Sequence, residues 1–347
     1  MKMAAYSRNT EHTEETRSTQ RVLFTEQAIA LFSVCSVPPL RSLCCAVLYY
    51  FKNRHLTMIN VTYPDPWLKC PRPSPNARLR LFCFPYAGGG ASVFRAWPQL
   101  MPPEVEVRIL QLPGRESRMG EEPFRCFTPM IHAVAQTMAQ FTDLPFAFYG
   151  HSMGALIAFE AARLLRTWRG VEPLHLFVSG CPAPQSIPVG RGRCAQSDTQ
   201  FIEELRQLNG TPAALLENQE LMQLFLPLLR ADFALCDSYR YVDGQPLSCP
   251  ITAFGGRRDP QVSTAQLTEW RHQTKRPLRQ GMFAGDHFFL HDALKPLIQM
   301  VGGLLRRHAS PRDPSPLQPA WPLLQDAARY FTTAAAERYQ PAVGLAG

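Results

Sequence analysis

The sequence predicts an α/β fold in which helices cover both faces of a mostly parallel central sheet. Apolar runs of strand length alternate with segments of helical spacing between residues 78 and 307. Most of the strand-like runs are almost continuously apolar, which is typical of strands buried on both faces. A serine flanked by glycines, in the pentapeptide Gly150-His-Ser-Met-Gly154, stands between one such run and a helical segment. This placement predicts a sharp strand-to-helix turn at Ser152.

Six strands are expected, because six short apolar runs end at turn residues. The first, RLRLFCF at 78–84, alternates and then becomes apolar before the glycine-rich PYAGGGASVF. The second, VEVRILQL at 105–112, ends at a Pro-Gly pair. The remaining four are PFAFY at 145–149, HLFVSG at 175–180, ITAFGG at 251–256 and PLRQGMF at 277–283.

Helical segments separate these strands. Their expected ranges are 127–141, 155–168, 264–274 and 289–307. A long, mostly helical insertion at about 198–240 follows the fourth strand. The chain shows no internal repeat, and one domain at 60–308 accounts for all of these elements.

The composition limits the possible functions. The 347 residues are 46% apolar and 18% charged, with a formal net charge of +8. No dense Lys/Arg block accompanies this charge, so nucleic acid is not an expected partner, whereas an acidic protein is compatible with it. The ten cysteines form no C-x-x-C pair. This spacing argues against a zinc site and a disulfide framework, and it favours reduced thiols in the cytoplasm.

The two ends of the chain differ from the middle. Residues 28–51 are apolar, but Pro38, Pro39 and Arg41 divide them into halves of about ten residues, half of what a bilayer span needs, so no stable membrane insertion is expected. We expect residues 1–57 to be a disordered extension. After residue 308 we expect a proline-rich linker and a separate helix at about 322–339, of unknown role.

Ser152 is the candidate nucleophile. Gly150 and Gly154 lack Cβ atoms, so strand and helix can approach closely while the serine adopts a strained conformation. That turn lifts the hydroxyl out at the carboxyl edge of the sheet. It also leaves the N–H of Met153 at the start of a helix, aimed at a developing oxyanion.

A serine nucleophile needs a base and an orienting acid, which follow it in the order Asp or Glu and then His in this kind of fold. Asp259 lies in the loop after ITAFGG, and His287 lies in the loop after the last strand. Both therefore fall at strand carboxyl ends, where such folds place their sites. His291 competes with His287 for the role of base, but a helix is expected to have begun there.

Other acidic and histidine side chains are weaker candidates. Asp286 is adjacent to the proposed base and is expected to point away from it. His151 is expected to pack behind the serine, and His175 and His272 are interpreted as structural or solvated. The second oxyanion donor is expected in the glycine-rich loop after the first strand, at the N–H of Ala87.

Several ordered motifs resemble the type II thioesterases associated with nonribosomal peptide and polyketide synthases. They are FCFPYAGGGASVF, LPGRESR, FYGHSMGALIAFEAARLL, LRADFALCDSYRY, FGGRRDPQVS and GDHFFL, and the resemblance extends from about residue 67 to residue 305. It implies an α/β-hydrolase fold with a helical lid at about 183–245. Catalysis would use Ser152, Asp259 and His287, with backbone donors at Ala87 and Met153 and no metal or diffusible cofactor.

The resemblance also implies a substrate and a partner. The enzyme would hydrolyse acyl thioesters on the phosphopantetheine arms of acyl or peptidyl carrier proteins, and so clear misprimed synthases. Carrier proteins are usually acidic, which suits the positive charge of this chain. The candidates for the docking patch are four arginines near the expected site edge, Arg115, Arg118, Arg257 and Arg258. The lid leucines, at helical spacings, are expected to pack on the body and to form a mobile apolar cap.

Alternatives remain open. A generic carboxylesterase or acyltransferase of the same fold would share every catalytic residue, and a non-catalytic carrier-binding subunit would retain the fold. A monomer is the default expectation. Residues 1–57 have no counterpart in the family pattern, whereas MINVTYPDPWLKCPRP from Met58 reads like an ordinary family start, so we expect translation to begin there. The segment after residue 307 is longer than the pattern implies.

Overall fold

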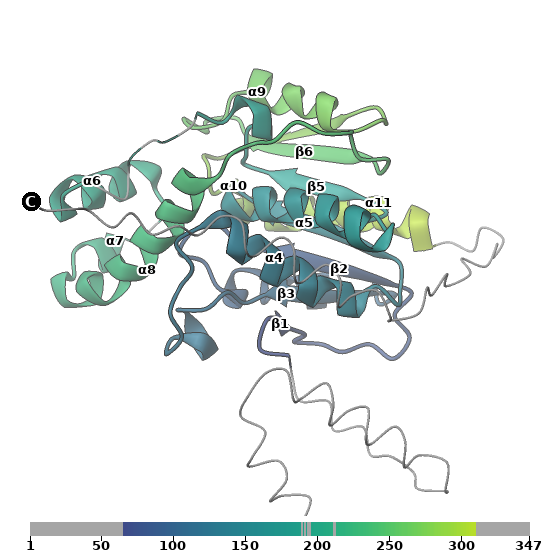
Figure 1. Ribbon diagram of the computed structural model, residues 1–347, viewed down its shortest axis with the longest axis horizontal. Coiled ribbons are helices and arrows are strands. Elements are labelled where there is room, and N and C mark those ends of the chain that lie inside the picture. Colours follow the sequence, from purple (N-terminus) through teal and green to yellow (C-terminus); the bar gives the residue numbers. More distant parts are fainter. Residues whose placement is uncertain (1–64, 189, 191, 193–195, 211–212, 310–347) are drawn as a thin grey trace, which may run out of the picture. The chain divides into compact units, whose positions relative to one another are not determined.

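The computed structural model describes residues 65–188, 190, 192, 196–210 and 213–309 (Figure 1). The expected extension at 1–57, the expected start at Met58 and the helix at 322–339 lie outside these residues. No helix among those described is long and apolar enough to cross a membrane.

A seven-stranded sheet in the order β1-β3-β2-β4-β5-β6-β7 forms the centre of the described chain. All neighbouring strands are parallel except β1, which pairs with β3 in the antiparallel sense. The mostly parallel sheet predicted from the sequence is therefore confirmed. The strands are β1 Leu68–Lys69, β2 Leu79–Phe84, β3 Val105–Leu110, β4 Phe146–His151, β5 Leu176–Ser179, β6 Ile251–Gly256 and β7 Arg279–Phe283.

Each face of the sheet has its own hydrophobic core, because side chains alternate along a strand. In β2, Phe82 and Phe84 pack with α4 Phe127–Met138 and α5 Met153–Arg169. Leu81 and Cys83 join the other core, which includes side chains of α11 Leu294–Ala309. Figure 1 shows α4 and α5 in front of the sheet and α11 behind it. Burial on both faces explains why these strands are almost continuously apolar.

Most of the remaining helices lie in segments that the sequence predicts to be helical. They are η2 Ala91–Phe94, α3 Trp97–Leu100, η3 Glu116–Arg118, η4 Ala139–Phe141, η5 Pro184–Ser186, α6 Asp198–Leu208, α7 Ala213–Leu216, α8 Gln219–Ser238, α9 Thr264–Thr268, η7 Glu269–Gln273, α10 Phe289–Asp292 and α11 Leu294–Ala309. Of these, η2, α3, η3 and η5 were not predicted. The single helix expected at 289–307 is divided into α10 and α11. Pro296 explains the division, since its ring conflicts with a helical carbonyl at Asp292, where α10 ends.

The insertion between β5 and β6 carries α6, α7 and α8, which lie together at one side of the sheet in Figure 1. These helices form a small core of their own, built from Phe201, Leu205, Met222, Leu226, Leu229 and Phe233. Ala87, which follows β2, packs against this core. The insertion therefore reaches the edge of the sheet at which the candidate site residues lie.

Candidate active site

Ser152 occupies a strained turn between β4 and α5. Its φ of 52° and ψ of −118° lie in a region that side-chain-bearing residues rarely adopt. The Ser152 N–H donates to the carbonyl oxygen of Ser179 at 2.8 Å, which ties the turn to the end of β5. The serine is only partly buried. Its hydroxyl is therefore presented at the carboxyl edge of the sheet by a backbone that the neighbouring strand holds in place.

The two glycines of the pentapeptide are sterically required. A Cβ atom on Gly150 would lie 2.1 Å from the carbonyl oxygen of Gly154. A Cβ atom on Gly154 would lie 2.0 Å from the carbonyl oxygen of Phe84 in β2. Both distances are far inside van der Waals contact with backbone atoms that cannot rotate away. The G-x-S-x-G spacing thus follows from how tightly α5 leaves the sheet.

Asp259 and His287 form a buried hydrogen-bonded pair. His287 Nδ1 lies 2.8 Å from Asp259 Oδ2, and the two side chains are 4% and 0% exposed. The other carboxylate oxygen, Oδ1, accepts the backbone N–H groups of Gln261 and Val262 at 2.8 and 3.2 Å. The carboxylate is therefore held from both sides, and it fixes the orientation of the imidazole.

The His287 ring lies beside the serine turn. Its centroid is 5.3 Å from that of His151, the residue immediately before Ser152. Among the described residues, the Ser152 hydroxyl has no hydrogen-bond partner. Contacts between a nucleophile and its base commonly tighten only when substrate binds. The three side chains named from the sequence thus converge on one rim of the sheet.

The competing histidines have other partners. His151 is fully buried, its Nδ1 lies 2.9 Å from Ser179 Oγ, and burial together with nearby His287 lowers its pKa well below the ordinary value. It is therefore neutral and packs behind the serine, as expected. His291 Nε2 lies 3.0 Å from the hydroxyl of Tyr86, and burial lowers the pKa of this imidazole too.

The remaining candidates lie elsewhere. Asp286 accepts the side-chain amide of Asn209 at 2.7 Å and the backbone N–H of Phe288 at 2.8 Å, and it does not pair with the neighbouring imidazole. His175 is buried, with its Nε2 2.8 Å from the hydroxyl of Thr252. His272 is exposed beside an acidic side chain. None of the three contacts the serine turn.

Two backbone N–H groups were predicted to receive the oxyanion, those of Met153 and Ala87. Met153 is the first residue of α5, where an N–H has no carbonyl partner within the helix. Ala87 lies in the loop after β2, and its N–H donates to no described residue. The following residue, Gly88, instead donates to a carboxylate oxygen of Asp232 in α8 at 2.7 Å. The loop thus leaves the Ala87 amide unpaired while its neighbour is fixed.

The structure corrects two of the arginines suggested for partner docking. Arg115 is buried and forms two hydrogen bonds to Asp232, and Arg118 is buried and pairs with Glu121. Neither guanidinium is available to a partner. Sequence reasoning missed Asp232, although an acidic side chain within the apolar stretch PLLRADFALC of a helix indicates a buried partner.

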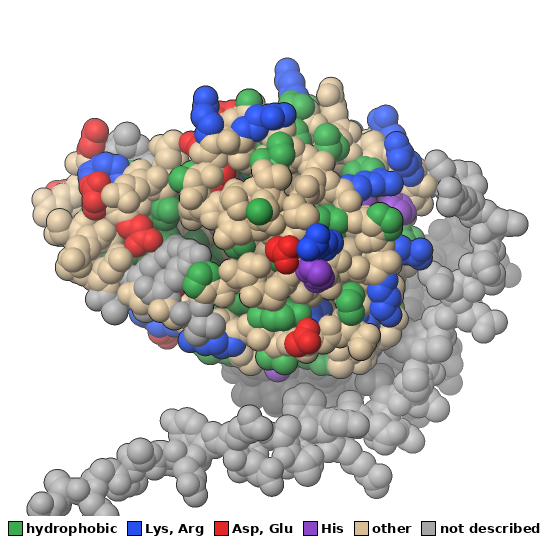
Figure 2. All heavy atoms as spheres, turned by 90° about the horizontal axis from the view of Figure 1, so that it is seen from above, with side chains coloured by type: hydrophobic (Ala, Val, Ile, Leu, Met, Phe, Trp, Pro, Cys, Tyr) green, Lys and Arg blue, Asp and Glu red, His purple; other side chains and the backbone are tan. Residues whose placement is uncertain are grey.

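The other two arginines, Arg257 and Arg258, are exposed beside Asp259. Figure 2 shows basic side chains at separate positions over the face it presents, with no single dense cluster. Charge alone therefore does not locate a docking patch on that face.

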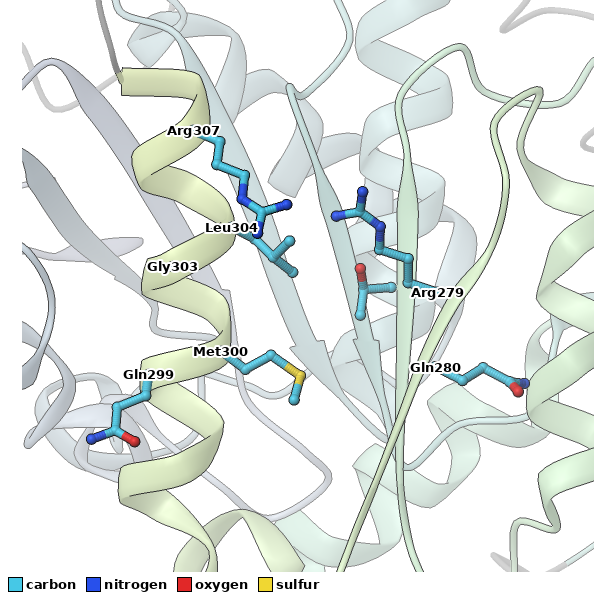
Figure 3. A pocket seen from close by; sticks show the side chains of 8 residues that line it. Arg279, Gln280, Gln299, Met300, Gly303, Leu304 and Arg307 are labelled. Atoms are coloured by element: carbon cyan, nitrogen blue, oxygen red, sulfur yellow. The ribbon is translucent and has the colours of Figure 1, made fainter.

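A cavity of about 500 Å³ lies away from these residues, between α11 and the start of β7. Its lining includes Arg279 and Arg307, whose side chains point toward one another across it (Figure 3). Arg279 begins β7, whereas His287 follows the end of that strand. The cavity therefore belongs to the opposite end of the sheet from the candidate site.

Comparison with known proteins places this geometry in a family. The thioesterase domain family matches residues 79–305. The gramicidin S biosynthesis protein GrsT of Aneurinibacillus migulanus is 46% identical over 255 residues, which cover 74% of this chain and 100% of GrsT. The thioesterase PikA5 of Streptomyces venezuelae is 35% identical over 264 residues, covering 76% of this chain and 94% of PikA5.

A solved structure agrees with these relatives. The type II thioesterase BorB from the borrelidin biosynthetic cluster matches with a TM-score of 0.64 and 33% identity, over 72% of this chain and 99% of BorB. Both the sequence pattern and the arrangement of the elements are shared. The chain belongs to the thioesterase domain family and has the α/β-hydrolase fold of the type II thioesterases.

Proposed function

We propose that this protein hydrolyses acyl thioesters carried on the phosphopantetheine arms of carrier proteins, and so clears misprimed nonribosomal peptide or polyketide synthases. The observation that supports this most is the buried Asp259–His287 pair beside the strained turn at Ser152. The relatives support the biosynthetic setting, since GrsT is named for gramicidin S biosynthesis and BorB for the borrelidin cluster.

In the proposed acylation step, Ser152 Oγ attacks the thioester carbonyl while His287 Nε2 accepts its proton. Asp259 holds the other ring nitrogen and stabilises the imidazolium that forms. The carbonyl oxygen becomes an oxyanion, and the N–H groups of Ala87 and Met153 would receive it. Each such donor is worth roughly 10²–10³ in rate.

The thioester suits this machinery because its leaving group is a thiol. A thiol with a pKa of about 8.5 departs with little help from a proton donor, unlike an amine. Collapse of the tetrahedral intermediate releases the pantetheine thiol and leaves an acyl-Ser152 ester. Water, deprotonated by His287, then attacks that ester and releases the free acid. We propose that no metal or diffusible cofactor takes part.

The proposed partner is an acidic carrier protein, and the proposed location is the cytoplasm. The formal charge of +8 favours attraction to an acidic partner. The six cysteines in the described part of the chain form no disulfide with one another, which fits a reducing compartment. We propose a monomer as the working form. We further propose that α6–α8 shape the acyl site, because their apolar core contacts Ala87.

An acyl-carrier assay tests this function. A purified carrier protein loaded with a short acyl group is incubated with the enzyme, and mass spectrometry follows the loss of the acyl mass. We expect the wild type to release the acid and Ser152→Ala to leave the carrier loaded, with both proteins folded by circular dichroism.

The same assay separates the alternatives. A strong preference for simple oxygen esters over the acyl carrier would favour a general carboxylesterase and overturn the proposal. Transfer of the acyl group to an added alcohol or amine, in place of water, would identify an acyltransferase. An acyl carrier that binds the protein but keeps its acyl group would identify a non-catalytic carrier-binding subunit.

A further inference from the structure

A buried ion pair joins the loop after β3 to the insertion. Arg115 donates from Nη1 and Nη2 to the two carboxylate oxygens of Asp232 in α8, at 2.8 and 2.7 Å. The two side chains are 4% and 0% exposed. Burying this ion pair costs free energy because both the guanidinium and the carboxylate lose their hydration. Apolar residues of similar volume at such positions often stabilise a protein as well or better. A contribution to stability therefore does not by itself explain why the Arg115–Asp232 pair is buried here.

The same two residues hold the loop that carries the proposed oxyanion donor. Asp232 Oδ2, one of the oxygens bound to the guanidinium, also accepts the N–H of Gly88 at 2.7 Å. Arg115 Nη1 also donates to the carbonyl oxygen of Gly89 at 3.1 Å. One carboxylate and one guanidinium thus hold two peptide groups after Ala87, the one that links Ala87 to Gly88 and the one that links Gly89 to Gly90. The peptide group that carries the unpaired Ala87 N–H lies in the same turn, in which the Gly89 N–H donates to the carbonyl oxygen of Tyr86 at 2.9 Å.

The helix that bears Asp232 fits the loop closely. Gly88 has a φ of 78°, and a Cβ atom there would lie 2.6 Å from Leu229 Cδ2, one turn earlier in α8. The loop therefore passes against the end of the Leu229 side chain, and its positive φ at Gly88 disfavours any residue other than glycine. Contact and hydrogen bonding together fix the distance between this helix and the loop.

A third polar side chain completes the arrangement. Gln111, fully buried after β3, accepts the N–H of Ala91 at 2.8 Å through Oε1. Its Nε2 donates to the carbonyl oxygen of Arg115 at 2.9 Å. The far end of the glycine-rich loop is thereby tied to the same segment that supplies the guanidinium. Both ends of the loop have fixed partners, while the Ala87 amide has none among the described residues.

We propose that Arg115 and Asp232 are positioning residues that aim the Ala87 N–H at the developing oxyanion, which makes α8 of the insertion a structural part of the oxyanion hole. The inference rests on the proposed function, since it assigns the pair a role in stabilising that tetrahedral intermediate. Neither residue touches the reacting atoms. Their effect passes through the peptide groups of Gly88 and Gly89.

The test separates positioning from stability. Arg115→Met and Asp232→Leu, made singly, each leave one buried charge unpaired, so both single variants should lose thermal stability and activity. The double variant removes both charges and should recover most of the lost melting temperature. Because the Gly88 N–H has then lost its acceptor, kcat should stay about 10- to 100-fold below wild type, with KM changed less than about threefold. Recovery of melting temperature together with wild-type kcat would overturn the proposal.

A control and a milder variant accompany this test. Asp198→Asn neutralises the exposed partner of Arg230, another ion pair of α8, and should keep the wild-type kcat. Asp232→Asn preserves the shape of the side chain. If the double variant does not fold, folded Asp232→Asn decides the question. A lower kcat at unchanged KM supports positioning, and an unchanged kcat contradicts it.

A second reagent keeps this inference distinct from the proposed function. A fluorophosphonate phosphonylates Ser152 with loss of fluoride and leaves a tetrahedral phosphonate ester whose oxygen occupies the same hole, and it needs no carrier protein. We expect the double variant to react about tenfold or more slowly than Asp198→Asn. If the wild type leaves acyl carriers intact, the proposed function fails while this comparison still decides the role of the pair. Equal rates would refute the positioning role even in an active thioesterase.

Discussion

His287 Nδ1 and Asp259 Oδ2 lie 2.8 Å apart, and the second oxygen of this carboxylate is bound by two backbone N–H groups. An acid held in this way cannot turn aside when the imidazole becomes charged. The neighbouring Asp286, one residue before the imidazole, is instead bonded to Asn209 of the insertion. Two carboxyl groups thus flank one histidine, and only one of them orients it.

This difference predicts the outcome of two matched substitutions. Asp259→Asn should lower kcat by about 10⁴, because the amide favours the wrong imidazole tautomer and cannot stabilise the imidazolium. Asp286→Asn makes the same chemical change beside the same histidine and should lower kcat less than about tenfold. Steady-state hydrolysis of an acyl-pantetheine thioester measures both. Equal losses in the two variants would contradict the assignment of the acid.

The strained backbone at Ser152 predicts that replacing this serine by glycine abolishes activity but relieves strain. The positive φ of Ser152 costs free energy with any side chain other than hydrogen. Ser152→Gly and Ser152→Ala should both be inactive, but the glycine variant should be more stable than the alanine variant by about 1 kcal/mol. Urea unfolding of the two variants measures the difference. A glycine variant less stable than the alanine variant would show that the turn is not strained.

The glycines of the chain should differ sharply in their tolerance of alanine. Gly154→Ala would drive a Cβ into the carbonyl oxygen of Phe84, so we expect a loss of at least about 3 kcal/mol of unfolding free energy or an insoluble protein. A Cβ atom on Gly303 in α11 would meet no neighbouring heavy atom of the described residues within 4 Å, and Gly303→Ala should stabilise the helix by about 0.5–1 kcal/mol. Thermal and urea unfolding distinguish the two. A tolerated Gly154→Ala would contradict the close packing of α5 on the sheet.

The central sheet was predictable because most of its strands are buried on both faces. Most of the six parallel strands are apolar runs that end at a turn residue, so hydrophobic periodicity and the turn residues locate them to within a few residues, whereas β7 begins with the exposed Arg279 and Gln280. β1 was not found, since a strand of two residues carries no periodic signal. The break before α11 was missed because helical spacing continues across it, and only the ring of Pro296 forbids one continuous helix.

The candidate site was predictable for a related reason. Parallel strands bring their carboxyl ends to one edge, so residues that follow β4, β6 and β7 meet there although they are distant in sequence. The Arg115–Asp232 pair follows no such rule. Arg115 and Asp232 are 117 residues apart. Asp232 lies in the helical insertion, and the order of the strands does not determine where that insertion packs. The only sequence signal for this pair is an acidic residue, Asp232, within an otherwise apolar helical stretch.

A buried histidine far from the serine predicts how stability changes with pH. Burial, with smaller contributions from nearby His308 and Arg279, lowers the pKa of His175 from 6.5 to about 3. The unfolded chain therefore binds a proton below about pH 6.5 that the folded chain binds only near pH 3. The unfolded state gains this stabilisation as the pH falls, so folding stability decreases through that window. Between pH 7 and pH 5 this one group should remove about 2 kcal/mol.

Two variants isolate this contribution. His175→Gln removes the imidazole, so its free energy of unfolding should fall less between pH 7 and pH 5 than that of the wild type, by about 2 kcal/mol. Thr252→Val removes the hydroxyl that lies 2.8 Å from the imidazole but leaves the ring in place to titrate. It should be less stable at every pH and keep most of the wild-type pH dependence. Urea unfolding at pH 7, 6 and 5 measures all three proteins. Parallel curves for the wild type and His175→Gln would mean that the folded protein admits the proton as readily as the unfolded chain, and that the ring is not sealed beneath α11.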